Sequence, residues 1–542
     1  MLQEEKKVLR RAKTCLGWNA YNYAQDTQLP YCENLGAGDV LRVRPKRGLV
    51  DTWAAPKALL TGSQMYSIRG DTLFLGETTV DDIGFFGGKE RKMALLGDYL
   101  AIWPDKVAVN VQDPSDFFSL ERTFAGQIQA SAWGAEGQEV AQVDALPDQA
   151  QEEQTAVVAG KRYVFRAGLW RADQRELWLR LQGTGLGAGF ANGDGVELTL
   201  GGQVRGCGRV ESRASDQVIL SGFYCANTSG VGVLKRRVPE LDQVISCGDR
   251  LFGCRYIAGV RNSLFACEKG NLRNWVAQGS WQSDRGEAGA WTGAVSLGGK
   301  AVFTKEQAIL SVSPKEDGQH AVAVLDGPGV AQGSEKSLVV GRGKAYYLAL
   351  PGVMEYDGGY PREIGQALGS ETYTDGVGVY CNGQYYLSAV NSWRIPQLLC
   401  YDLDRKIWRR EDQLRALFLA RLGGKAYAVE ADGKLWDLEG SEGYPEGDIP
   451  FAMHFPRLCL EKGQRLHAVQ LDLELEGSAE VFIQFDGQEP APKIGQVEGC
   501  GLKRVLLPVP RRKADHIQLQ LEGIGPCVLH GVVYELKEAG GQ

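Results

Sequence analysis

Histidine is scarce in this 542-residue chain, which has five, at positions 320, 454, 467, 516 and 530. Histidine is the usual general acid or base near neutral pH, so acid–base catalysis has few of its usual agents here. The motifs G-x-S-x-G and H-E-x-x-H are also missing. These absences remove two common hydrolase signatures. We therefore predict no catalytic residue and no enzymatic activity.

No C-x-x-C pair occurs, and no histidine lies close to a cysteine pair at the spacing of a zinc site. We predict no metal site and no cofactor. Several cysteines fall inside strand-like apolar runs, so we expect free, buried thiols, with disulfides or a metal as the alternatives. The twelve cysteines are Cys15, Cys32, Cys207, Cys225, Cys247, Cys254, Cys267, Cys381, Cys400, Cys459, Cys500 and Cys527.

Long apolar runs are missing as well, and none approaches 18 residues, so no membrane span is expected. The first residues, Met1–Lys7, are charged and no apolar core follows them, which predicts a protein without a signal peptide, folded in a cytosol. A net charge of -7 with a pI near 5.6 argues against a general nucleic-acid binder.

Glycine, in contrast, is abundant: 70 of 542 residues, about twice the usual share. It has no G-X-Y period, which excludes collagen. Glycines scattered between short apolar runs are typical of many tight turns. The composition therefore predicts an all-β protein.

Short apolar runs joined by Gly-Asp or Gly-Gly turns recur along the chain. The turn glycines Gly248, Gly299, Gly343, Gly383 and Gly424 are 51, 44, 40 and 41 residues apart. A period of 40 to 50 residues with several short strands per unit is that of a β-propeller blade. We predict about seven blades, with six or eight as alternatives, near residues 58–80, 82–115, 240–277, 290–315, 334–368, 375–412 and 415–440.

In the third of these units, Gly248-Asp249 should turn the chain between two strands. Residues Gly270–Trp275 should form a corner in which Trp275 covers the rim of the blade. Cys247, Cys254 and Cys267 lie close in sequence here, but on strands they have no reason to converge on a metal.

Two other β regions interrupt or follow the repeat. Val196, Leu198 and Leu200 alternate with polar residues inside a long gap between units, and longer alternating strands follow residue 448. We predict an N-terminal arm with the first blades at 1–122, an inserted small β-domain at 123–235, the remaining blades at 236–447 and a C-terminal β-sandwich at 448–542. Asp412–Leu422 is a weak helix candidate that we expect to be a strand.

Several short motifs favour structural interpretations. Arg69-Gly70-Asp71 is expected to be a hairpin turn, Gly183–Gly189 a loop without the Lys-Ser/Thr of a phosphate loop, and Leu435-Trp436-Asp437 a strand end. Ser283–Trp291 is an imperfect match to the Asp-box of sialidases. The basic run Arg42–Gly48 is either a phosphate-contacting arm or an extended, solvated or interface segment.

Some of these stretches resemble bacteriophage tail propeller proteins. The opening Gly17–Leu35 with the Arg44–Gly48 corner is similar to theirs, although two residues are inserted in the corner. Leu241–Cys254 resembles their Asn-Arg-Leu-Trp-Gly blade, with Asp249 and Phe252 replacing Asn and Trp. Ser263–Trp275 is similar to their Asn-Trp corner, and Gly193–Leu198 to their inserted domain.

The resemblance touches residues 1–120 and 190–280 and implies a virion structural protein of the tail, with no catalytic residues to carry over. It implies assembly in the host bacterial cytoplasm, contacts with other tail or virion proteins, a homo-oligomer in the particle and a role in host attachment through a surface receptor. The alternative is a glycan-binding or glycan-hydrolysing propeller enzyme whose sandwich binds carbohydrate. A bacterial surface adhesin is a third hypothesis, which the expected lack of a signal peptide disfavours.

Overall fold

The computed structural model describes residues 6–12, 17–20, 28–36, 40–81, 83–85, 90–315 and 319–538. Cys15, most of Met1–Lys7, residues 21–27 of the N-terminal resemblance and residues 82 and 86–89 of the second expected blade lie outside these ranges. The chain divides into two compact units. One comprises residues 1–70, 304–309 and 325–542, and the other comprises 71–303 and 310–324.

The protein is a β-propeller with an inserted β-domain and a C-terminal β-sandwich, as the sequence predicts. In the described ranges, seven small sheets form the blades. The first blade consists of β6 (Pro56–Thr61), β7 (Met65–Arg69), β8 (Thr72–Leu75) and β9 (Thr78–Val80), and the second of β10 (Lys92–Leu96), β11 (Tyr99–Trp103), β12 (Val107–Asn110) and β13 (Phe117–Ser119). The third consists of β24 (Gln243–Cys247), β25 (Arg250–Ile257), β26 (Arg261–Ala266) and β27 (Trp281–Asp284). The fourth consists of β28 (Gly293–Leu297), β29 (Lys300–Lys305), β30 (Ala308–Pro314) and β31 (His320–Asp326).

The last three blades belong to the first unit. The fifth blade consists of β32 (Val339–Gly341), β33 (Lys344–Ala349), β34 (Gly352–Tyr356) and β35 (Arg362–Glu363). The sixth consists of β36 (Tyr373–Cys381), β37 (Gln384–Asn391), β38 (Pro396–Asp402) and β39 (Ile407–Arg410). The seventh consists of β40 (Ala416–Leu422), β41 (Lys425–Glu430), β42 (Lys434–Asp437), β5 (Gly48–Thr52) and β43 (Tyr444–Pro445). Short 3-10 turns precede two of these sheets, at Glu335–Ser337 and Gln366–Leu368. Asp412–Leu422 contains strand β40, as expected.

The repeating glycines are explained by their backbone angles. Gly343 and Gly383 have φ of 75° and 80°, and the residues before them, Arg342 and Asn382, are also positive at 50° and 48°. Two consecutive positive φ values define the tight hairpin turn whose twist matches that of the flanking strands. Glycine adopts this conformation without steric cost, so its spacing reveals the blades.

The seventh blade contains a strand that the sequence did not predict. β5 precedes the first blade in the chain, yet it pairs antiparallel with β42, matching Trp436 with Leu49 and Asp437 with Gly48. A Cβ atom on Gly48 would lie 1.7 Å from the Glu442 carbonyl oxygen, so the close approach of the two segments requires glycine. The last blade thus combines strands from both ends of the propeller sequence.

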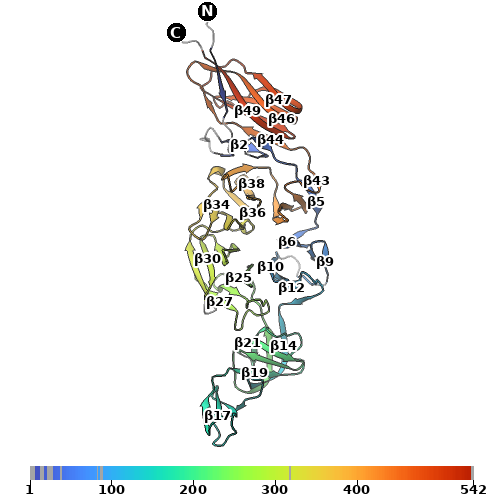
Figure 1. Cartoon of the computed structure of the whole chain (residues 1–542), viewed down its shortest axis with the longest axis vertical. Helices are drawn as coiled ribbons and strands as arrows, with labels where there is room; N and C mark the ends of the chain where they lie inside the picture. Colours follow the sequence, from blue (N-terminus) through green and yellow to red (C-terminus); the bar gives the residue numbers. More distant parts are fainter. Residues whose placement is uncertain are drawn as a thin grey trace, which may run out of the picture. The chain divides into compact units, whose positions relative to one another are not determined.

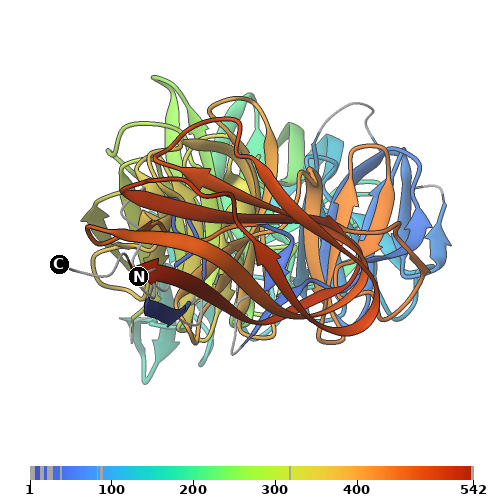
Figure 2. The same cartoon turned by 90° about the horizontal axis from the view of Figure 1, so that it is seen from above.

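The sandwich is one extensively curved sheet with a buried core, seen as long red strands in Figure 2. Its strand order is β2-β44-β48-β46-β49-β4-β3, and β1, β45 and β47 pair alongside. In β48, Ile517, Leu519 and Leu521 are fully buried and alternate with polar residues, the pattern of a sheet with one wet face. Its later strands are β44 (Pro450–His454), β45 (Leu458–Cys459), β46 (Gln464–Phe485), β47 (Lys493–Pro508), β48 (His516–Ile524) and β49 (Cys527–Glu538).

The N-terminal segment completes this same sheet. Its strands are β1 (Lys6–Arg11), β2 (Tyr31–Glu33), β3 (Leu35–Gly36) and β4 (Leu41–Val43). β1 and β4 pair with β49, and β2, in blue in Figure 1, pairs with β44. The expected N-terminal arm is therefore part of the sandwich.

The insert between the second and third blades belongs to the second unit. It contains a closed barrel in the order β14-β19-β22-β21-β20-β23 and a separate small sheet, β15-β16-β17-β18. Leu181, Leu198 and Leu234 are fully buried in the barrel core. The strands are β14 (Arg122–Gly134), β15 (Ala141–Gln142), β16 (Thr155–Val158), β17 (Lys161–Arg166), β18 (Leu169–Ala172), β19 (Leu177–Gln182), β20 (Gly195–Leu200), β21 (Gln203–Ala214), β22 (Gln217–Ser221) and β23 (Thr228–Arg236).

Candidate functional site: a buried arginine–carboxylate network

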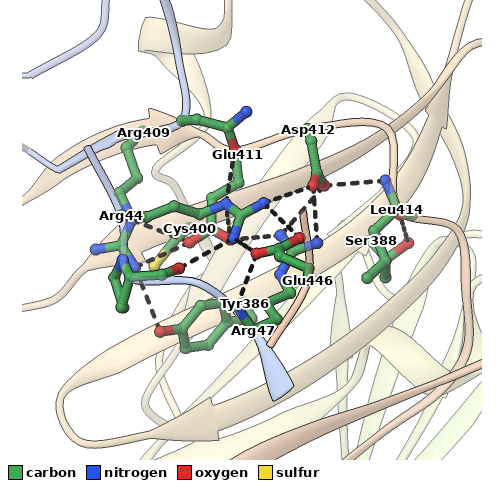
Figure 3. A network of polar contacts seen from close by, with 12 residues as sticks. Arg44, Arg47, Tyr386, Ser388, Cys400, Arg409, Glu411, Asp412, Leu414 and Glu446 are labelled. Carbon is green, nitrogen blue, oxygen red and sulfur yellow. Dashed lines mark hydrogen bonds and ion pairs between the residues drawn. The ribbon is translucent and has the colours of Figure 1, made fainter. Parts of the chain in front are cut away.

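The chain passes between sandwich and propeller twice, and polar side chains gather where it does so. It enters the propeller through Arg44–Arg47, between β4 and β5, and leaves through Glu446, between β43 and β44. Glu411 and Asp412 lie on the connection from β39 to β40, so the sixth and seventh blades also contribute. Figure 3 shows these side chains pointing toward one another.

Arg47 lies at the centre of this network and is 2% exposed. Its Nη2 donates to Glu411 Oε2 at 2.8 Å and its Nη1 donates to Asp412 Oδ2 at 2.8 Å. Its backbone NH donates to Glu446 Oε1 at 2.7 Å. Charge-assisted hydrogen bonds in such geometry are stronger than neutral ones. Although burial opposes the charge, Glu411 and Asp412 raise the pKa of Arg47, which stays protonated.

Arg44, which precedes Arg47 by three positions, makes a similar set of ion pairs and hydrogen bonds. It pairs with Glu446, and its Nη2 donates to Asp412 Oδ2 at 3.0 Å. Its Nε donates to Asn34 Oδ1 at 2.7 Å, and the Asn34 amide in turn donates to the Pro450 carbonyl at 2.9 Å. Arg44 therefore links the carboxylates of the propeller, through Asn34, to the sandwich at Pro450, where β44 begins.

Arg409, on β39, completes the network from the propeller side. Its Nη2 donates to Glu411 Oε1 at 3.1 Å and to Gln384 Oε1 at 3.0 Å. Burial alone would raise the pKa of Glu411, but Arg409, Arg47 and Arg44 together lower it, so the carboxylate is ionised. Burial raises the pKa of the neighbouring Cys400 thiol to about 12, which leaves that thiol protonated and unreactive.

The charges in this network balance. Three guanidinium groups, of Arg44, Arg47 and Arg409, face three carboxylates, of Glu411, Asp412 and Glu446. Each carboxylate already accepts hydrogen bonds from arginine, so its lone pairs are engaged in structure. The arrangement is suited to holding three chain segments together rather than to acid–base chemistry.

The network shows what surrounds the basic run Arg42–Gly48 in the structure. Two of its cations, Arg44 and Arg47, are buried against carboxylates, whereas Lys46 pairs with Asp448 at 2.8 Å on the surface. The segment is an extended interface within the chain, which was one of the two interpretations of the run. Sequence alone could not identify the partners, because they lie more than 360 residues away.

A second buried network lies in the second unit, at the Asn-Trp corner. Asp194, which is fully buried, accepts a hydrogen bond from Arg236 Nη1 at 2.6 Å. Arg236 also donates to the carbonyls of Ser119 and Leu120 at 2.7 and 2.9 Å. Asn271 Nδ2 donates to the Gly193 carbonyl at 2.7 Å. The corner therefore fixes the inserted barrel to the propeller.

Trp275 has a different environment from the expected rim position. It is 2% exposed, and its ring packs edge-on against Trp103 of the second blade with centroids 5.8 Å apart. Its Nε1 donates to the Leu272 carbonyl at 2.9 Å. Trp275 thus packs between two blades.

The other sequence motifs occupy ordinary positions. Gly70-Asp71 lies between β7 and β8, Gly183–Gly189 joins β19 to β20, and Leu435-Trp436-Asp437 lies on β42. The Gly185 NH donates to Asp216 Oδ1 at 2.6 Å. Asp437 is fully buried and accepts hydrogen bonds from the Ser441 NH and hydroxyl at 2.8 and 2.6 Å, which fixes the turn after β42.

The cysteines that the structure describes are free, and most of them are buried. Cys459 and Cys500 are exposed, which differs from the expectation of burial. Cys267 accepts a hydrogen bond from the Leu251 NH at 3.1 Å, and burial raises the pKa of its thiol to about 12. Within the described ranges, no helix has the length and apolar character needed to cross a membrane.

Comparisons with known proteins do not assign the chain to a family. No family model and no curated protein matches it. A computationally designed protein, Ika8, is 10% identical over 72% of this chain and 98% of its own, with a TM-score of 0.33. PorZ of Porphyromonas gingivalis is 11% identical over 84% of this chain and 75% of its own (TM-score 0.27). An exo-β-1,3-galactanase from Phanerochaete chrysosporium is 9% identical over 54% of this chain and 94% of its own (TM-score 0.22). Similarity at this level says nothing about function.

Proposed function

We propose that the protein is a non-enzymatic structural component of a bacteriophage tail, or of a phage-like particle, which acts through protein–protein contacts in virion assembly and in host attachment. The observation that carries the proposal is the network around Arg47. It joins the N-terminal segment, the last two blades and the sandwich through balanced charges that are buried or partly buried. A protein that bears load between partners benefits from such fixed connections.

The resemblance of the corner and blade stretches to tail propeller proteins adds to this proposal. The network explains one of those stretches, because the Arg44–Gly48 corner supplies its two central arginines. The Ser263–Trp275 corner holds the inserted barrel through Asn271. Both resembling stretches thus lie at joints between parts of the molecule.

Labelling of particles tests the proposal. Particles are purified from the bacterium that carries the gene and imaged in negative stain with a gold-conjugated antibody against this chain. We expect gold on the tail, at a number of sites that matches the oligomer mass of the isolated protein. Absence of the chain from every particle fraction would overturn the proposal.

The alternative hypothesis is a glycan-hydrolysing propeller. Glycosidases need two carboxyl groups placed about the scissile bond, one of which donates a proton. The three carboxylates of the network are all paired with arginine, so they do not favour this hypothesis. Turnover of a panel of chromogenic glycosides, abolished by substitution of one Asp or Glu, would replace our proposal with an enzyme.

A further inference from the structure

A cavity of about 810 Å³ lies in the second unit, where the inserted barrel meets the third blade. The barrel contributes Glu197, Cys207 and Lys235, and the blade contributes Arg255, Phe265 and Trp281. Its volume is within the range of sites that bind small molecules or short oligomers.

A second cavity, of about 500 Å³, lies beside the first. Ile257, Val260, Arg261 and Gln282 line both cavities. The turn between β25 and β26 therefore separates them, and Val260 at its tip is 78% exposed. Two adjoining cavities with a shared rim suit an extended ligand better than a compact one.

The carboxylates of the larger cavity are already paired with cations. Lys106 Nζ lies 2.8 Å from Glu121 Oε1 and 2.6 Å from Glu240 Oε1, and Arg237 Nη1 lies 3.7 Å from Glu197 Oε2. Five lining residues are cationic and three are anionic. The lining therefore carries a surplus of positive charge.

This surplus is concentrated on a few side chains. In the part of the chain that the structure describes, Lys235 and Arg261 have neither an ion pair within 4.0 Å nor a side-chain hydrogen bond. Hydrogen bonds from Ser263 and Gln282, together with the charge of Arg261, lower the pKa of Asp284 in the smaller cavity. Arg255 also lines the larger cavity but is already paired with Asp242 through Nη1, so Lys235 and Arg261 supply the surplus.

Aromatic rings complete the lining. Phe265 and Trp275 are buried, whereas Trp281 is partly exposed and can offer a ring face to a ligand. The C–H face of a sugar ring is apolar and packs on such a ring, while its hydroxyls accept and donate hydrogen bonds. Cations and an accessible indole together match a sugar that carries a carboxylate.

We propose that the two cavities form a binding site for an acidic oligosaccharide. Lys235 and Arg261 pair with its carboxylates, and Trp281 packs on one of its rings. The carboxylates of the larger cavity are engaged with Lys106 and Arg237. In the smaller cavity Glu287 pairs with Arg285, and Asp284 accepts a hydrogen bond from Ser263 Oγ at 2.6 Å, so the site binds the chain without cleaving it. Its biological meaning, recognition of an acidic surface glycan, rests on the host-attachment part of the proposed function.

Calorimetric titration of the full-length protein tests this inference. The probes are hexagalacturonate and its fully methyl-esterified form, which keeps the sugar rings and removes the charge. We expect the acid to bind and the ester to bind at least about tenfold more weakly, the factor that one lost charge-assisted hydrogen bond gives. Affinity for the acid should fall as salt rises from 50 to 300 mM.

Matched variants test whether the residues that line the two cavities form the binding site. Arg261→Ala and Trp281→Ala should each weaken hexagalacturonate binding about tenfold. Arg213→Ala removes an exposed arginine of the same barrel away from the cavities and should leave binding unchanged. Circular dichroism checks that each variant is folded.

Three results would overturn the inference: no binding of hexagalacturonate at millimolar concentration, equal binding of the ester, or equal binding of hexaglutamate. The last would show a general polyanion site rather than a sugar site. Particle labelling is independent of this titration, so failure of the glycan inference leaves the tail proposal standing, and the reverse also holds.

Discussion

Arg47 and Glu411 form a buried ion pair of 2.8 Å between residues 364 positions apart in the sequence. Arg47 lies on the segment that leads into β5, and Glu411 follows β39. The pair therefore joins the start of the propeller sequence to its sixth blade, and both side chains are almost fully buried.

Breaking this pair should strongly destabilise the first unit. Glu411→Gln leaves the charges of Arg47 and Arg409 in a buried setting without their shared partner, which costs about 3–5 kcal/mol. Urea titration monitored by tryptophan fluorescence measures the loss. Lys46→Ala, which removes the neighbouring surface pair with Asp448, is the matched control and should cost about 0–1 kcal/mol. Equal effects of the two substitutions would show that burial of the network contributes nothing.

The same carboxylate gives the stability a defined pH dependence. Because the pKa of Glu411 is lower in the folded chain than its ordinary value of 4.5, its contribution is present above about pH 4.5. It is lost as the pH falls through the depressed folded pKa. We expect the free energy of unfolding to fall more steeply below pH 4.5 in the parent protein than in Glu411→Gln. Parallel acid profiles of the two proteins would contradict this assignment.

The hairpin turns can be tested at a glycine with open space around it. Gly343 has φ of 75°, and no atom lies within 4 Å of an added Cβ. Gly343→Ala should therefore cost about 1–2 kcal/mol through backbone conformation alone. Gly286→Ala, also in open space but without positive φ, should change stability by less than about 1 kcal/mol. Thermal unfolding compares the two, and a neutral Gly343→Ala would contradict the turn assignment.

Docking of the inserted barrel depends on Asp194. Arg236→Met leaves this fully buried carboxylate without its 2.6 Å partner, at a cost of about 3–5 kcal/mol. We expect limited proteolysis to release the insert faster from this variant than from the parent protein. Arg237→Ala, which removes a half-exposed arginine 3.7 Å from Glu197, serves as the control. Cleavage at the same rate in all three proteins would show that the pair does not hold the barrel.

The blades could be predicted because their signal is local. Each hairpin requires positive φ at its turn, and a glycine such as Gly383 reports that requirement within a few residues of the strands it joins. The long strands of the sandwich could be predicted locally as well, because apolar residues that become buried, such as Ile517 and Leu519, alternate with polar ones.

The joints could not be predicted, because they depend on pairing between distant segments. β5 is a short segment, Gly48–Thr52, whose partner β42 lies almost 400 residues later. Arg44 and Arg47 read as a basic run because their carboxylate partners are equally distant. Likewise, nothing near β2 indicates that it pairs with β44. Long-range pairing leaves no periodic trace in a single sequence.

The double passage of the chain between sandwich and propeller has a mechanical consequence. Tension applied to the sandwich is shared by two covalent segments in parallel, one ending at Arg47 and the other beginning at Glu446. Since β5 starts directly after Arg47, a pull that would peel this strand from the last blade must first break the arginine–carboxylate pairs. Strand β5 is thus protected from load by the cluster of paired charges beside it.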